Sequence, residues 1–156
     1  MDYTKGILQR LTAFEQLLEA GCEATLIQLA TPSRERISHY RQTRREVEEA
    51  VGRINGRFGE VGRPVIHYIH RGVGKTQLHA YYAAADIMVV TPFKDGMNLV
   101  AKEYVAAHPD GSGALVLSEF AGAAVELHQA YLCNPFDLAS IKAATVSYTH
   151  LTLPTN

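Results

Sequence analysis

The sequence predicts a doubly wound α/β fold, in which a Rossmann-like parallel sheet is covered by helices on both faces. Three observations lead to this prediction: helical and strand-like segments alternate, the strand-like segments are short and mostly apolar, and loops with glycine or proline follow several of them. Strands with few polar residues are typical of a sheet that is buried on both sides. Their alternation with helices favours right-handed crossovers between parallel strands.

Helices are predicted where apolar residues recur at helical spacing. Residues 7–19 carry such a pattern, and Gly21 ends it. Residues 37–58 form a longer, charged segment, in which arginines and glutamates of mixed sign are typical of a solvated helix face. Further helices are predicted at residues 76–84, 98–107, 122–127 and 137–144, the last of them capped by Asp137.

Short apolar runs predict the strands. They lie at residues 24–30, 65–69, 87–91, 113–118 and 131–133. The most strand-like run is Ile-Met-Val-Val-Thr at 87–91, which Pro92 closes. Ligands of doubly wound sheets bind beyond the carboxyl ends of the strands. The candidate ligand loops are therefore residues 31–36, 70–75 and 92–99.

The composition argues against several classes of partner. The chain has 156 residues, 47% of them hydrophobic and 20% charged, with a formal net charge of -1, so it lacks the basic excess of a nucleic-acid or membrane-surface protein. No segment approaches the ~18 apolar residues of a membrane-spanning helix or shows a signal-peptide core. Two cysteines, Cys22 and Cys133, without metal-ligand spacing fit a reducing compartment. We expect a cytoplasmic protein with no nucleic-acid or membrane partner.

The two ends of the sequence do not fit a complete domain. The first predicted helix has no strand before it, so we expect residues 1–145 to be a domain truncated at its N-terminus. Residues 146–156 are abruptly polar and threonine-rich after an alanine-rich helix. We expect this tail to be a fusion or vector scar outside the native fold. The alternative is an ordinary disordered terminus.

The most informative segment is residues 91–103, where a strand end, a glycine turn and a helix start follow one another. The N–H groups at the start of such a helix are unpaired and lie at its positive end, which suits a diphosphate. Asp95 in the turn can accept hydrogen bonds from sugar hydroxyls, and Glu103 can reach a ribose diol. Taken alone, these residues are more often an ordinary turn and a surface helix position, so the wider sequence must decide.

This segment, Thr-Pro-Phe-Lys-Asp-Gly-Met-Asn-Leu-Val-Ala-Lys-Glu, resembles the signature of the trehalose-6-phosphate synthases, retaining GT-B glycosyltransferases that use UDP-glucose. Residues 2–7, 30–34, 52–56 and 118–124 resemble further motifs of that family, in the same order. The similarity covers residues 2–145 and implies the nucleotide-sugar-binding, C-terminal half of a GT-B enzyme. It also implies that the N-terminal half, the acceptor-site residues and a diphosphate-binding arginine are missing.

The resemblance implies a role for each matching residue. Lys5 would face the donor diphosphate and Asp95 the glucose hydroxyls, so these two are the expected catalytic residues. Arg34 would bind the phosphate of glucose-6-phosphate with its planar, always-charged fork. Glu103 would hold the ribose, and Val73 would contact the nucleotide through its backbone. The donor-binding residues implied in this way are Lys5, Val73, Asp95, Gly96, Met97, Asn98, Leu99, Val100 and Glu103.

Two other patterns give no separate site. Gly74-Lys75-Thr76 resembles the end of a Walker A loop, but Ile69 stands where its first glycine is required. The histidines of residues 67–79 lack the HExxH spacing of a zinc site, and the family needs no metal. We therefore expect neither a metal nor a cofactor.

The leading hypothesis is a fragment of an enzyme that transfers glucose from UDP-glucose to glucose-6-phosphate with retention, giving trehalose-6-phosphate and UDP. The fragment alone is expected to be inactive. Two alternatives stay open: the same donor half with another acceptor, glycerol-3-phosphate or a cyclitol phosphate, and a non-catalytic nucleotide-sugar-binding module. The donor base (UDP, GDP or ADP) and the oligomeric state of a full-length protein, a homo-oligomer included, also stay open.

Overall fold

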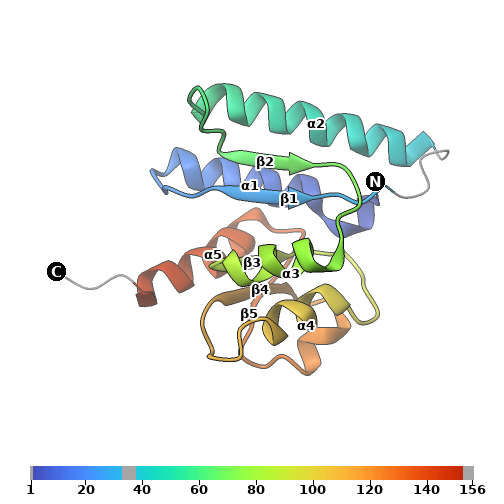
Figure 1. The fold of residues 1–156 in the computed structure, drawn as a ribbon, viewed down its shortest axis with the longest axis vertical. Coiled ribbons are helices and arrows are strands. Elements are labelled where there is room, and N and C mark those ends of the chain that lie inside the picture. Colours follow the sequence, from blue (N-terminus) through green and yellow to red (C-terminus); the bar gives the residue numbers. More distant parts are fainter. Residues whose placement is uncertain (1, 33–37, 153–156) are drawn as a thin grey trace. The chain divides into compact units, whose positions relative to one another are not determined.

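The computed structural model describes residues 2–32 and 38–152. The chain divides into two compact units, which Figure 1 shows in ribbon form. Most of the first unit is residues 7–73, and the second consists of residues 4–6 together with the chain from Gly74 onward. The short 3₁₀ helix η1 (Tyr3–Lys5) stands at the start of the chain. Because Tyr3 belongs to the first unit, the chain passes between the units three times: after Tyr3, after Gly6 and after Val73.

The first unit is a two-stranded parallel sheet with two helices. Its elements are α1 (Ile7–Glu19), β1 (Leu26–Leu29), α2 (Ser38–Phe58) and β2 (Ile66–Ile69). Leu26 pairs with Ile66 and Leu29 with Ile69 in the parallel register. The apolar face of each helix packs into one core, whose buried members are Ile7, Leu11, Phe14, Ala30, Val47, Val51, Ile54 and Ile66.

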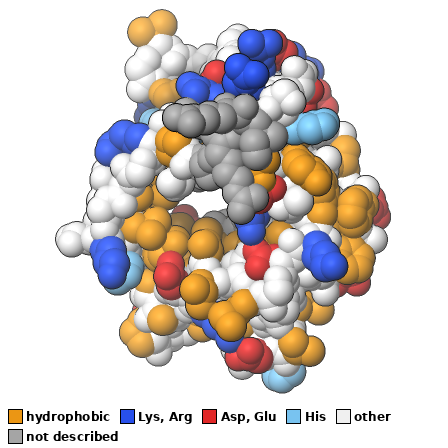
Figure 2. Space-filling view, turned by 90° about the vertical axis from the view of Figure 1, so that its right-hand side faces the viewer, with side chains coloured by type: hydrophobic (Ala, Val, Ile, Leu, Met, Phe, Trp, Pro, Cys, Tyr) orange, Lys and Arg blue, Asp and Glu red, His pale blue; other side chains and the backbone are white. Residues whose placement is uncertain are grey.

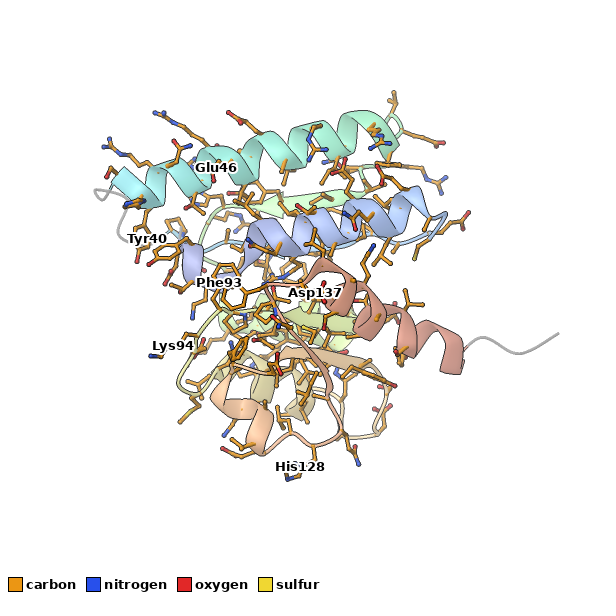
Figure 3. The ribbon with its side chains drawn as sticks, turned by 180° about the vertical axis from the view of Figure 1, so that it is seen from behind. Tyr40, Glu46, Phe93, Lys94, His128 and Asp137 are labelled. Carbon is orange, nitrogen blue, oxygen red and sulfur yellow. The ribbon has the colours of Figure 1, made fainter. Side chains whose placement is uncertain are left out.

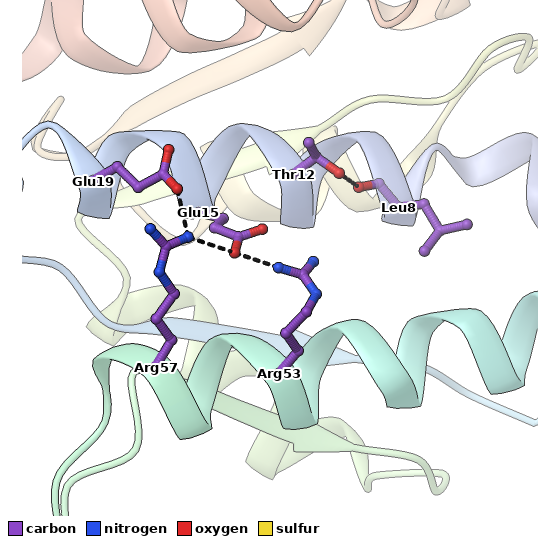
Figure 4. A network of polar contacts seen from close by, with 6 residues as sticks. All are labelled: Leu8, Thr12, Glu15, Glu19, Arg53 and Arg57. Carbon is purple, nitrogen blue, oxygen red and sulfur yellow. Dashed lines mark hydrogen bonds and ion pairs between the residues drawn. The ribbon is translucent and has the colours of Figure 1, made fainter.

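Residues 52–56, one of the motifs singled out in the sequence, have a structural role in this unit. Arg53 from α2 pairs with Glu15, a buried carboxylate of α1 that also accepts from Arg57 at 3.3 Å (Figure 4). Ile54 is fully buried in the core. The side-chain amide of Asn55 bonds both backbone groups of Ile66, at 2.9 Å to the carbonyl and 2.8 Å from the N–H. The motif therefore joins α2 to α1 and to β2.

The second unit is a three-stranded parallel sheet in the order β3-β4-β5. Its elements are α3 (Lys75–Ala84), β3 (Ile87–Val90), α4 (Leu99–Ala106), β4 (Ala114–Ser118), η2 (Gly122–Val125), β5 (Tyr131–Cys133) and α5 (Leu138–Thr152). The central strand β4 is buried along its whole length, since α4 and α5 pack against it as well as its neighbouring strands. The predicted α/β class, with parallel strands and flanking helices, is confirmed.

Helix α5 extends further than the sequence pattern indicated. We predicted an end at about residue 144, but the helix continues to Thr152. No glycine or proline interrupts residues 145–152. The hydroxyls of Thr145 and Ser147 donate to the carbonyls of Ile141 and Ala143, both at 2.8 Å, which is compatible with a continuing helix. The non-native origin of residues 146–156 stays a prediction.

The surface carries no extended region of one charge on the face shown in Figure 2, where acidic and basic side chains alternate with hydrophobic ones. None of the helices in the part of the chain that the structure describes is long and apolar enough to cross a membrane.

Candidate active site

Most of the predicted donor-binding residues lie in or beside the segment that leaves the carboxyl end of β3, residues 91–98, here called the donor loop. Figure 3 shows Phe93 and Lys94 in this loop. Its start is fixed to residues 4–6: the Phe93 N–H donates to the carbonyl of Thr4 at 2.7 Å, and the Thr91 hydroxyl donates to that of Gly6 at 3.2 Å. Gly6 has a φ of +63°, and an added Cβ would lie 2.0 Å from the Thr91 oxygen, so only glycine fits.

These contacts bring Lys5 and Asp95 together, ninety positions apart in the sequence. The Lys5 Nζ lies 2.7 Å from Asp95 Oδ2. The lysine side chain is 48% exposed and the aspartate side chain 16% exposed, so the pair lies at the surface with the carboxylate as its more enclosed member. A cation that can face a diphosphate therefore adjoins a carboxylate that can accept from sugar hydroxyls.

Asp95 is held by two further donors. Its Oδ1 accepts from the Met97 N–H at 3.3 Å, and its Oδ2 accepts from the Asn98 amide at 3.2 Å. Burial by itself would raise the pKa of Asp95, but the hydrogen bonds from Lys5, Met97 and Asn98, together with the lysine charge, lower it below the ordinary value. The carboxylate is thus ionised and oriented at neutral pH.

Asn98 connects Asp95 to helix α4. It is the N-cap residue: its Oδ1 accepts from the Ala101 N–H at 3.0 Å, while its amide group donates to Asp95. With φ 69° and ψ 80°, it is the one residue other than glycine with a positive φ among residues 2–32 and 38–152. Beyond this cap, the N–H groups of Leu99 and Val100 belong to the first turn, where helical N–H groups lack intrahelical partners. The expected helix start is therefore present, and its binding of an anion stays a prediction.

The other predicted site residues lie in different surroundings. Glu103 is exposed on α4, and its Oε2 accepts from the hydroxyl of Tyr82 on α3 at 3.1 Å. Burial, with the hydrogen bond and charge of Glu103, raises the pKa of Tyr82 to about 12. Val73 is half-buried at the end of the first unit, and Arg34 lies outside the described residues. The roles assigned to these residues stay predictions.

Sequence reasoning missed the surroundings of Asp95. An open pocket of about 480 Å³ adjoins it, lined by residues 94–96, 119–122, 124, 125 and 132. Residues 118–124 had been singled out only as a motif. The glycine at position 122 was a signal for a close backbone approach.

The described residues contain no cluster of three or more histidine, cysteine, aspartate or glutamate side chains that could hold a metal. The donor loop gathers a cation, an ionised carboxylate and a helix start, which together suit an anionic, hydroxylated ligand.

Residues 1–154 match glycosyltransferase family 20. The chain belongs to this family. A trehalose-6-phosphate synthase from Mycobacterium avium (strain 104) is 60% identical over 146 residues, covering 91% of this chain and 30% of that protein. One from Mycobacterium leprae (strain TN) is 58% identical over 146 residues, covering 91% and 29%. The chain thus spans about 30% of the length of these curated relatives.

Solved structures agree with this family. An α,α-trehalose-phosphate synthase (UDP-forming) from Burkholderia xenovorans, in complex with glucose-6-phosphate, has a TM-score of 0.90 and 43% identity over 98% of this chain and 34% of that chain. An E. coli structure bound with UDP-2-fluoro glucose has a TM-score of 0.89 and 41% identity, over 97% and 34%. The family resemblance and the GT-B fold class expected from the motifs are confirmed.

Proposed function

We propose that this chain is the donor-binding part of a retaining glycosyltransferase that transfers glucose from UDP-glucose to glucose-6-phosphate, giving trehalose-6-phosphate and UDP. The observation that carries the proposal is the Lys5–Asp95 pair at the start of α4. In a nucleotide sugar, the diphosphate and the sugar are directly joined. A cation and a carboxylate only 2.7 Å apart match these two neighbouring groups.

The diphosphate would lie between Lys5 and the first turn of α4. As the bond between the anomeric carbon and the phosphate oxygen breaks, its electron pair stays with UDP, whose negative charge grows. A fixed ammonium group and the N–H groups of Leu99 and Val100 stabilise this developing charge more than they stabilise the ground state. Lys5 therefore acts on the rate of bond breaking.

Asp95 is a binding group in this proposal. Its carboxylate is lodged among the Lys5, Met97 and Asn98 donors, and its lowered pKa keeps it an acceptor for glucose hydroxyls. Retention then needs no protein nucleophile. The departing diphosphate guides the acceptor hydroxyl to the same face of the sugar and takes its proton, while the acceptor oxygen forms the new bond to the anomeric carbon.

The remaining assignments complete the donor and acceptor sites. Glu103 is proposed to hold the ribose, Val73 to contact the nucleotide through its backbone, and Arg34 to bind the phosphate of the acceptor. The names of the relatives support UDP as the nucleotide and glucose-6-phosphate as the acceptor, because structures of the family are described with both kinds of molecule. Catalysis needs a second GT-B half, which would supply the rest of the acceptor site.

A chimera tests this proposal. Residues 1–145 replace the matched span of the M. avium relative, and nucleotide release is followed with UDP-, GDP- or ADP-glucose and glucose-6-phosphate. We expect release from UDP-glucose and an α,α-linked product by NMR. The 156-residue chain alone is expected to show none. A folded chimera without turnover contradicts the proposal, and turnover with only GDP- or ADP-glucose contradicts the assigned base.

A further inference from the structure

The segment that follows β4, residues 118–123, contacts the donor loop through its backbone and is here called the brace segment. The Asp95 N–H donates to the Phe120 carbonyl at 3.3 Å, and the Gly122 N–H donates to the Asp95 carbonyl at 2.9 Å. The Ala123 N–H donates to the Met97 carbonyl at 2.8 Å. Both backbone groups of Asp95 are therefore fixed by a segment 25 or more positions away in the sequence.

Gly122 lies against the donor loop without space for a side chain. A Cβ at this position would be 2.0 Å from the Gly96 carbonyl oxygen and 2.7 Å from its carbon, well inside the 3.4 Å at which ordinary contact begins. The atoms it would meet belong to the backbone, so no side-chain rotation can relieve the overlap. Since Gly122 has no positive φ, the close approach, and not the local conformation, requires glycine here.

The brace segment is itself anchored. Ser118 is fully buried at the end of β4, and its hydroxyl accepts from the Phe120 N–H at 3.1 Å. Ala121 and Ala123 are buried in the core of the second unit. In the donor loop, by contrast, Met97 is 51% exposed. A clash between the two segments will therefore move the loop, because a close-packed core yields less than an exposed turn.

Aromatic rings form a second connection between the two segments. Phe93 of the donor loop stacks on Phe136 with centroids 4.7 Å apart, and Phe136 lies 5.9 Å from Phe120 of the brace segment. The loop is thus held at Phe93 and again at residues 95–97.

We propose that Gly122 is a positioning residue for donor binding, in that its close backbone approach sets where the Asp95 carboxylate stands relative to Lys5. The inference rests on the proposed function, since its effect is on the sugar end of a nucleotide sugar. Displacement of a binding group by on the order of 1 Å is enough to change rates by about 10²-fold in enzymes. The motif at residues 118–124 then serves the site without touching the ligand through a side chain.

The test compares Gly122→Ala with Gly56→Ala in the 156-residue chain. Gly56 is an exposed glycine of α2 at which a Cβ meets nothing, so the chemical change is the same and no clash follows. UDP-glucose and UDP binding are measured by calorimetry. We expect Gly122→Ala to lower the affinity for UDP-glucose at least tenfold more than that for UDP, because Asp95 meets only the sugar, while Gly56→Ala leaves both unchanged.

Two further measurements keep the result decisive. The pKa of the Asp95 carboxyl, followed by carbon NMR, should rise in Gly122→Ala as its donors are displaced, whether or not a donor binds. Ser118→Ala removes an anchor of the brace segment without adding bulk and should act in the same direction, more weakly. A folded Gly122→Ala variant with unchanged affinities and an unchanged Asp95 pKa overturns the inference. A wild-type chain that binds neither nucleotide overturns the proposed function, and the assignment of Gly122 to donor binding with it.

Discussion

Asn98 allows the energetics of the donor loop to be tested most directly. Asn98→Ala removes the acceptor for the Ala101 N–H, which costs about 1 kcal/mol. It also places alanine in a left-handed backbone conformation, with a φ of 69°, where its methyl group is strained and makes no compensating hydrogen bond. This strain lowers the free energy of unfolding by about 1 kcal/mol more. The expected loss is about 2 kcal/mol, or about 4–8 °C in the unfolding temperature of a chain of this size.

Asn98→Gly separates the two contributions. Glycine removes the same side chain but accepts the left-handed conformation without strain, so its expected cost is below about 1 kcal/mol. Asn98→Asp keeps the cap acceptor but sets a second carboxylate beside Asp95, which should raise the pKa of that carboxyl. Urea unfolding of the chain measures the first two variants and carbon NMR the third. Equal destabilisation by alanine and glycine would refute the reasoning, because strain would then contribute nothing.

Two other predictions concern the site and its support. In the chimera, Lys5→Ala should lower kcat by on the order of 10²-fold, whereas Glu103→Gln should mainly raise the KM for UDP-glucose. Steady-state measurements of nucleotide release give both constants. If Lys5→Ala mainly raised the KM and Glu103→Gln mainly lowered kcat, both proposed roles would be rejected. Tyr82 has its pKa raised to about 12 in the folded chain, so the native state holds the proton between pH 10 and 12 while the unfolded state releases it. Stability should be intact below pH 10 and fall by up to about 1 kcal/mol towards pH 11 on account of this group. Urea titrations at pH 9 and 11 should show a total loss that is smaller by this amount in Tyr82→Phe, while the contributions of Tyr68 and Tyr104, whose pKa values are also raised to about 12, remain.

The sequence alone was sufficient to predict the strands and helices, which depend on local patterns of apolar residues. Short apolar runs and helical periodicity located the strands and helices, because burial on both faces of a sheet leaves that pattern in the residues themselves. The junction of Lys5 with Asp95 was different. It depends on residues 4–6 packing beside the end of β3, and only the family resemblance pointed to it.

Features that depend on tertiary contact escaped prediction. Asn98 was expected at a helix start, but its left-handed backbone and its bond to Asp95 require the folded loop. Tyr82, the partner of Glu103, comes from another helix, and a buried hydroxyl gives no pattern in the sequence. The end of α5 was placed too early because residues 146–156, polar and rich in threonine, were expected to lie outside the native fold. Threonine and serine hydroxyls can bond back to helical carbonyls, and those of Thr145 and Ser147 do so.

The passage of the chain between its two units has a consequence for engineering. The second unit is built from two separate segments of the chain. Residues 4–6 supply Lys5, and the chain from Gly74 onward supplies Asp95 and all the helices and strands from α3 to α5. A continuous excision that starts at Gly74 therefore loses Lys5, whereas a chain in which a linker replaces residues 7–73 and joins residues 1–6 to Gly74 retains it. Most of the first unit, residues 7–73, is thus inserted between the two segments that carry Lys5 and Asp95.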